Sequence, residues 1–137
     1  MAYWLMKTEP GTWSWDDQVK EGTTFWDGVR NFQASNNMKK MKIRDRCFFY
    51  HSGKERQIVG VVEMVKAYYA DHTDRTGRFG MVDVKTIGPL AKPVTLAAIK
   101  AEPDFADFLL VRASRLSVMP VSAAYWKRIC GMGGGAP

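Results

Sequence analysis

Residues 46–69 read RCFFYHSGKERQIVGVVEMVKAYY and carry the strongest strand signal of the chain. β-Branched and aromatic residues dominate Arg46–Ser52 and Gln57–Tyr69, as is typical of strands. Only Gly53–Arg56 separates the two runs, so they are predicted to pair as an antiparallel hairpin. Gly60 interrupts the second run, and a glycine in a strand interior indicates a bulge or the close approach of another group.

Shorter elements are predicted on both sides of this hairpin. Ala2–Lys7 is apolar on both faces and fits a strand in the middle of a sheet. Caps, apolar spacing and proline positions predict helices over 14–22, 29–41, 94–108 with an interruption at Pro103, and 122–130, strands over 81–87 and 114–121, and a turn over 88–93. Because strands and helices do not alternate regularly, the predicted class is α+β, with an antiparallel, strongly curved sheet or small barrel flanked by short helices.

Length and composition predict a single domain. The chain has 137 residues, of which 46% are hydrophobic and 25% charged, as in ordinary globular proteins. We expect the domain over 1–132 and a flexible tail over 133–137. No apolar run approaches the ~20 residues that span a bilayer, and the first ten residues do not resemble a signal peptide. A cytoplasmic monomer without a membrane partner is therefore expected.

No sequence motif indicates a metal or a cofactor. Cys47 and Cys130 are isolated, without a Cys-x-x-Cys spacing or a neighbouring His. Two buried, reduced thiols are therefore expected, and no metal, no cofactor and no disulfide. The sequence also lacks a Gly-rich phosphate loop and the Gly-x-Ser-x-Gly motif of a hydrolase nucleophile.

The formal net charge of +6 favours a polyanionic partner without establishing one. Positive charge gathers in Met38–Arg46, which holds five basic residues and one acid. Such a run contacts phosphates in some proteins and is merely solvated in others, and both interpretations stay open here. The candidate phosphate contacts are Lys39, Lys40, Lys42, Arg44 and Arg115.

Seventeen aromatic residues, five Trp, five Tyr and seven Phe, belong either to the core or to a binding surface. Trp4, Phe48 and Trp126 have apolar neighbours in the sequence and are assigned to the core. Trp26 differs, because an Asp-Gly turn follows it and Arg30 comes one helical turn later. A flat ring beside amide and guanidinium donors suits a planar base, yet the local sequence leaves Trp26 equally compatible with the core.

The two histidines do not indicate a nucleophilic enzyme. His51 and Ser52 are neighbours at a strand end, so their side chains point to opposite faces and cannot easily act together. A structural His51, hydrogen-bonded at the strand end, or a polar pocket wall fits better. His72 lies in a loop rich in Asp and Thr.

Several segments, taken in order, resemble the EVE domain family, which includes the thymocyte nuclear protein group. They are YWLMKTEP, FWDGVRNFQASN, FFYHS, IVGVVEMV, PVTL and RLSVMPV, and the resemblance extends from Tyr3 to Met132. It implies a PUA-like fold, a curved and mostly antiparallel β-barrel flanked by helices, related to YTH and ASCH domains. It also implies a non-catalytic domain that recognises a modified base in DNA or RNA, or a free modified nucleoside, with 5-methylcytosine and its oxidised forms as candidates.

The resemblance further implies which residues line a ligand pocket. They are Lys7, Trp26, Asn31, Tyr50, His51, Ser52, Leu116 and Ser117. In YTH readers of N6-methyladenosine, a strand-end Lys, a Trp and a later aromatic surround the methylated base. Lys7 and Trp26 are the counterparts of the first two, and Phe79 is the candidate for the third.

Two other functions stay open at the level of sequence. Some ASCH-type relatives hydrolyse modified nucleosides, and Lys7, Thr8, Glu9 and Glu63 offer similar groups. Glu63 lies among valines within a strand, so it is either an inward carboxylate with a perturbed pKa or an ordinary outward charge. The third function is a protein-interaction module whose pocket is filled by its own side chains.

Overall fold

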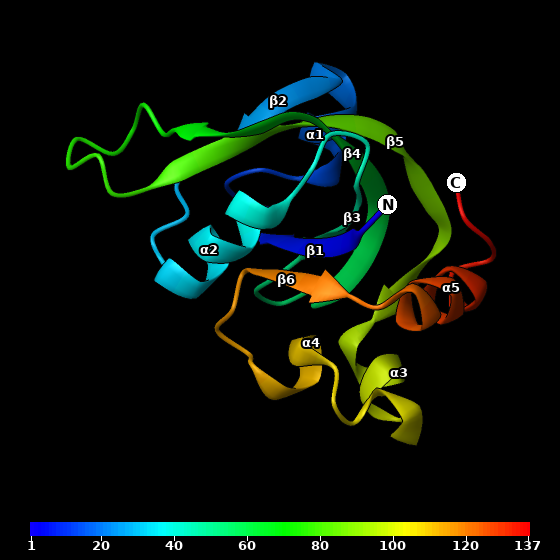
Figure 1. Cartoon of the computed structure of the whole chain (residues 1–137). Helices are drawn as coiled ribbons and strands as arrows, with labels where there is room; N and C mark the ends of the chain where they lie inside the picture. Colours follow the sequence, from blue (N-terminus) through cyan, green and yellow to red (C-terminus); the bar gives the residue numbers. More distant parts are fainter.

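The computed structural model describes all 137 residues and shows one six-stranded sheet with short helices around it (Figure 1). The strands are β1 (Tyr3–Thr8), β2 (Thr23–Trp26), β3 (Arg46–His51), β4 (Gln57–Ala70), β5 (Gly80–Thr95) and β6 (Val118–Val121). The α-helices are α1 (Trp15–Glu21), α2 (Phe32–Lys40), α3 (Leu96–Lys100), α4 (Leu109–Arg112) and α5 (Ala123–Met132), and Pro103–Phe105 forms a 3-10 turn.

The sheet confirms the α+β class but not the barrel. The strand order is β2-β5-β4-β3-β1-β6, and the edge strands β2 and β6 do not pair with each other. The predicted hairpin of β3 and β4 is antiparallel, as expected. β1 lies inside the sheet, as its two apolar faces predicted, but it runs parallel to β3. The sheet is therefore mixed and open.

Gly60 explains how the long strands β4 and β5 bend. The pairing register shifts on both sides of Gly60, and the Trp15 ring covers it so closely that a Cβ atom there would lie 2.4 Å from the indole. The prediction of a bulge or a close approach is confirmed in both respects. The predicted turn over 88–93 is wrong, because β5 continues through it. Pro89 lacks an amide donor, and the register shifts beside Gly60 accommodate it opposite that residue.

Two predicted helix caps are confirmed. Ser14 accepts a hydrogen bond from the Asp17 amide, and the Asp17 carboxylate accepts one from the Ser14 amide, which is a capping box. Ser122 caps α5 through the Tyr125 amide. α5 then buries Trp126 against Phe48, with ring centroids 3.8 Å apart. These contacts fix one end of the sheet.

α2 starts later than its apolar spacing predicted, because Asn31 caps it through the Ala34 amide. Met38 and Met41 are buried, whereas Phe32 is 61% exposed and does not belong to the buried face. The helix contacts β4, β5 and β6, and the loop over 27–31 connects it to the end of β2.

The remaining helices lie beyond the β6 edge, where α3 and α4 sit together and away from β2 (Figure 1). None of the helices combines the length and the apolar character needed to cross a membrane. The chain termini lie near each other, and Met1 and Pro137 line the same shallow depression. The Gly133 carbonyl accepts a hydrogen bond from the Lys92 amide. The flexibility of the tail over 133–137 stays a prediction.

Candidate functional site

A cavity of about 450 Å³ opens where four segments meet. It is lined by residues 7–9 at the end of β1, by Thr12 and Trp13 in the next loop, by residues 24–31 from β2 to the N-cap of α2, and by Ser117 before β6. Its volume lies in the range of small-molecule sites. The cavity is open, so the structure does not favour a domain whose pocket is filled by its own side chains.

The structure brings half of the predicted pocket residues to this cavity. Lys7, Trp26, Asn31 and Ser117 line it. Tyr50, His51, Ser52 and Leu116 do not. The ligand contacts of all eight residues stay predictions. Packing and hydrogen bonds within the protein account for the positions of the four residues that lie outside the cavity.

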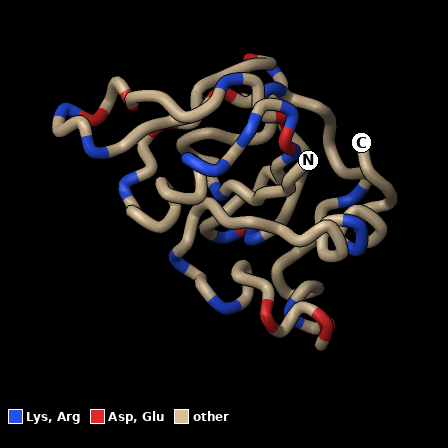
Figure 2. The backbone as a smooth tube through the Cα atoms, viewed as in Figure 1, with Lys and Arg blue, Asp and Glu red and all other residues tan.

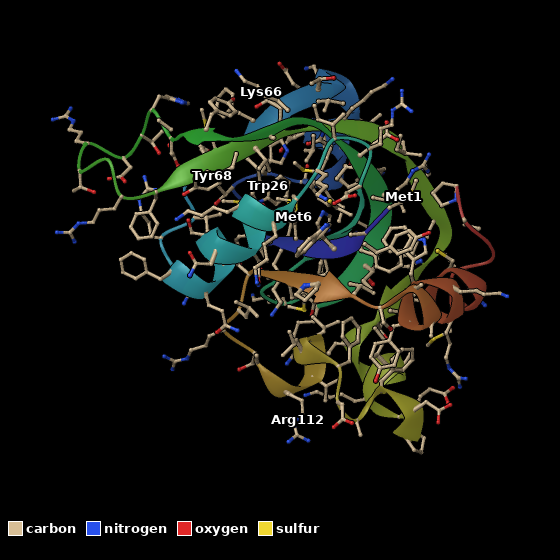
Figure 3. The ribbon with its side chains drawn as sticks, in the orientation of Figure 1. Met1, Met6, Trp26, Lys66, Tyr68 and Arg112 are labelled. Atoms are coloured by element: carbon tan, nitrogen blue, oxygen red, sulfur yellow. The ribbon has the colours of Figure 1, made fainter.

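Trp26 belongs to the core and to the cavity at once. Its side chain is only 7% exposed, and its ring meets Phe49 edge to face at 5.5 Å. The same residue forms part of the cavity wall. Figure 3 shows Trp26 within the body of the domain, whereas Arg112 lies at its edge. A residue packed in this way offers a ligand a rigid surface.

Lys7 lines the cavity, and its ammonium group is hydrogen-bonded to the backbone. Nζ donates a hydrogen bond to the Ser114 carbonyl at 3.0 Å, and burial lowers the Lys7 pKa from its usual range. The Tyr50 ring lies next to it, with its centroid 5.7 Å from Nζ. Tyr50 is 2% exposed and its pKa is raised by burial, so it supports Lys7 and does not face the cavity.

His51 is held by the backbone of α1. Its Nε2 accepts a hydrogen bond from the Trp15 amide at 2.9 Å, and its Nδ1 lies 3.0 Å from the Glu55 carboxylate. The imidazole therefore carries its proton on Nδ1, and this hydrogen bond lowers the Glu55 pKa. The structural interpretation of His51 agrees with these contacts, and the side chain is not a wall of the cavity.

Ser52 and Leu116 are also placed by packing and pairing. The Ser52 amide donates to the Thr8 carbonyl at 2.9 Å and so extends the pairing of β1 with β3. Leu116 is 4% exposed and belongs to the core cluster. The sequence segments that suggested Ser52 and Leu116 as pocket residues are local. They do not show the pairing of Ser52 with Thr8 or the burial of Leu116 in the core.

The oxygen and the nitrogen of the Asn31 side-chain amide have different roles. Its Oδ1 accepts the Ala34 amide at 2.9 Å and caps α2. Its Nδ2 has no partner within the protein, and the residue lines the cavity. The amide group is therefore free to donate to a ligand.

Sequence reasoning missed Asp71, which anchors the cavity loop. Its side chain is fully buried, and its carboxylate accepts hydrogen bonds from the Gly28 amide at 2.9 Å and from the Arg30 guanidinium at 3.0 Å. Burial raises the Asp71 pKa, but hydrogen bonds from Thr73, Gly28 and Arg30 outweigh it and hold the pKa well below its usual range. The signal that could have found it is the Asp-x-Thr spacing, since Thr73 bonds the same carboxylate as in an Asx turn.

The predicted phosphate contacts lie outside the cavity. Lys39, Lys40, Lys42, Arg44 and Arg115 are all exposed, and none forms an ion pair. Lys40 ends α2, roughly 13 Å along the helix from Asn31 at 1.5 Å per residue. Figure 2 shows that Lys and Arg are spread over many parts of the chain. The phosphate role of this segment stays a prediction.

Glu63 does not join the cavity. Its carboxylate lies 3.7 Å from the Arg46 guanidinium, and both side chains are partly exposed. Of the two possibilities for Glu63, an inward carboxylate or an outward charge, the structure shows the outward charge. Thr8 and Glu9 do line the cavity, beside Lys7.

In this α+β domain, the ends of β1 and β2 and the start of β6 surround one cavity, which is lined by an indole, a free amide and charges of both signs. The chain belongs to the EVE domain family, whose family model matches residues 2–132. It is 33% identical to chicken (Gallus gallus) thymocyte nuclear protein 1 over 88% of this chain and 64% of that protein. It thus spans slightly less than two thirds of that relative's length.

Solved structures share the fold over the whole chain. A protein of Rhodopseudomonas palustris determined by NMR has 51% sequence identity and a TM-score of 0.92, covering 98% of this chain and 94% of that one. Human THYN1 in complex with DNA containing 5-methylcytosine has 29% identity and a TM-score of 0.91, and the match covers 100% of both chains. The YTH domain of Mmi1, at 12% identity over 96% of this chain and 86% of that one, has a TM-score of 0.59, a likeness of fold alone.

Proposed function

We propose that this chain is a non-catalytic domain that binds nucleic acid carrying a modified base and takes that base into the cavity beside Trp26. The observation that carries the proposal is the cavity wall, to which both the rigid indole of Trp26 and the free amide of Asn31 contribute. The human relative solved with 5-methylcytosine DNA supports a modified cytosine as the ligand.

The polar groups of the cavity suit a base with an exocyclic amine. Cytosine donates through its exocyclic amine and accepts at its carbonyl oxygen and at a ring nitrogen. Glu9 and Asp27 offer carboxylate acceptors, while Asn31 and Arg30 offer donors. Thymine and uracil lack the amine and would leave an acceptor without a partner, which is the larger source of selectivity.

A methyl group on the base adds a smaller contribution. Phe25, Trp26 and Val29 supply apolar surface to the cavity. Burying one methyl group is worth about 0.8 kcal/mol, so methylated and unmodified cytosine should differ only about fourfold in affinity from this term. A paired base must also leave its duplex at a cost of a few kcal/mol, which favours single-stranded ligands.

A nucleoside hydrolase is the second candidate function, because Lys7, Thr8 and Glu9 all line the cavity and burial lowers the Lys7 pKa. The existing hydrogen bonds disfavour it. The Thr8 hydroxyl donates to the Trp13 carbonyl at 3.0 Å, and Lys7 Nζ donates to the Ser114 carbonyl. The hydroxyl proton of Thr8 is thus directed to Trp13 and not to Lys7.

The test is fluorescence anisotropy with single-stranded oligonucleotides that differ only in one 5-methylcytosine. Trp26→Leu keeps an apolar side chain in the core and should weaken binding about 5- to 150-fold, the range of one lost base stack. Asn31→Ser keeps the cap of α2 and removes only the amide donor. Ile43→Ala, at an exposed apolar position outside the cavity, is the control.

Two results would contradict this function. Equal affinity of wild type and Trp26→Leu would exclude the indole wall, provided that both proteins unfold cooperatively. Mass spectrometry of modified nucleosides after incubation should show no turnover. Conversion that Lys7→Ala abolishes would establish the hydrolase instead.

A further inference from the structure

A second aromatic surface lies beside the cavity and takes no part in the core. Phe32 is 61% exposed, and it directly follows Asn31, which lines the cavity. Its ring centroid lies 4.9 Å from that of Phe79, at an interplanar angle of 33°. Phe79 comes from the end of the loop between β4 and β5, so two distant segments build this pair.

The Asp74 carboxylate orders the loop that carries Phe79. The Asp74 carboxylate accepts hydrogen bonds from the Phe79 amide at 2.7 Å, the Arg78 amide at 3.0 Å and the Thr76 hydroxyl and amide. These bonds lower the Asp74 pKa to about 2. The aromatic pair is therefore held on a preorganised turn.

Arg30 connects the pair to the cavity. It lines the cavity, and its guanidinium carbon lies 5.6 Å from the Phe79 ring centroid. The same guanidinium bonds Asp71 and the Thr73 hydroxyl at the base of the loop. The cavity, Arg30 and the aromatic pair thus form one continuous surface.

The loop also presents unpaired positive charge. Arg75 and Arg78 are exposed, and neither forms an ion pair. Asp74 faces the backbone amides of the turn. The β4–β5 loop extends beyond the body of the domain on the side where α2 begins (Figure 1), and Figure 2 shows basic segments along it. Aromatic rings beside free guanidinium groups are what single-stranded nucleic acids bind.

We propose that Phe32, supported by Phe79, stacks the nucleotide next to the base in the cavity, while Arg78 contacts its phosphate. This inference rests on the proposed function and deepens it. It makes the ligand a polynucleotide strand and excludes a free nucleoside as the preferred ligand, because the second subsite is empty when a nucleoside binds.

The experiment compares two ligands on two variants by calorimetry or anisotropy. The ligands are 5-methyldeoxycytidine monophosphate and a short single strand with a central 5-methyldeoxycytidine. The variants are Phe32→Ser and, as a matched control, Ile43→Ser, whose side chain is 58% exposed outside the cavity. Phe32→Ser should weaken binding of the strand about 5- to 150-fold and leave the mononucleotide unchanged, whereas Ile43→Ser should change neither.

Each other outcome decides against the subsite. If Phe32→Ser leaves strand affinity intact, or weakens both ligands equally, the subsite is wrong. If wild type binds the mononucleotide as tightly as the strand, the subsite is wrong and the proposed function stands. If wild type binds neither ligand, the proposed function fails as well. If Phe32→Ser converts a dimer to a monomer in sedimentation without changing strand affinity, the aromatic pair binds a second copy of the chain instead.

Discussion

Asp71 and Arg30 are 41 positions apart in the sequence, yet their side chains are joined at 3.0 Å. Asp71 follows β4, and Arg30 lies in the loop between β2 and α2 that lines the cavity. One buried carboxylate thereby fixes the position of the cavity loop relative to the sheet.

Asp71→Asn should destabilise the domain. An amide cannot accept all the hydrogen bonds that the carboxylate takes, and the Arg30 charge loses its partner. Because Arg30 is 40% exposed, water screens part of this loss, and we expect about 1–3 kcal/mol from the hydrogen bonds to a charged group. Urea unfolding measures it. Asp107→Asn, with a side chain 94% exposed, is the control and should have no effect.

Acid should unfold the protein partly through the same carboxylate. The pKa of Asp71 is lowered in the folded state, so the stability that it supplies is full above its unfolded pKa of about 3.9 and is lost as pH falls further. The midpoint of urea unfolding should therefore fall between about pH 4 and pH 2. Asp71→Asn should lose less stability over this interval than wild type. An equal loss in both proteins would assign the acid sensitivity to other groups.

The local signals of the sequence predicted the fold class because they act within a few residues. The hairpin of β3 and β4 and the caps at Ser14 and Ser122 are of this kind. The parallel pairing of β1 with β3 joins Tyr3 to Arg46, and no local pattern encodes the direction of such a pair. That pairing is what makes the sheet mixed where an antiparallel barrel was expected.

The candidate site shows the same difference between residues with local sequence cues and residues whose partners are distant in the sequence. Trp26 and Asn31 adjoin a turn and a helix start, and their neighbours already indicated an unusual environment. His51 was ambiguous because its partner, the Trp15 amide, lies 36 positions away. The role of Asp71 was missed for the same reason, because its partners Gly28 and Arg30 lie 43 and 41 positions away. Residues whose partners are distant in sequence need the register of the sheet before their role can be inferred.

His51→Ala should reduce stability without a specific effect on ligand affinity. The buried Trp15 amide would lose its acceptor, at a cost of about 1–3 kcal/mol. Thermal unfolding and oligonucleotide titration below the transition measure the two effects separately. His72→Ala, at an exposed position, should change stability by no more than about 0.5 kcal/mol. A large loss of ligand affinity in a folded His51→Ala variant would show that His51 takes part in binding.

Gly60→Ala should be costly, because a Cβ atom would lie 2.4 Å from the Trp15 ring. Trp15 packs against Phe49 at 5.2 Å and cannot retreat without disturbing the core. Overpacking of this kind costs about 1–3 kcal/mol. Gly11→Ala is the matched control, since no atom lies within 4 Å of its Cβ position. Equal unfolding midpoints for the two variants would show that Trp15 moves freely.

The salt dependence of binding should distinguish the two basic surfaces. A residue that contacts a phosphate of a single strand contributes about 0.7 to the slope of log affinity against log salt concentration. Arg78 lies on the loop beside the cavity, whereas Lys40 is roughly 13 Å along α2 from Asn31. For a short strand, Arg78→Gln should lower the slope and Lys40→Gln should leave it unchanged. For a strand long enough to follow α2, both variants should lower it. If only Lys40→Gln changes the slope with short strands, the nucleic acid follows the Met38–Arg46 segment and the β4–β5 loop does not contact it.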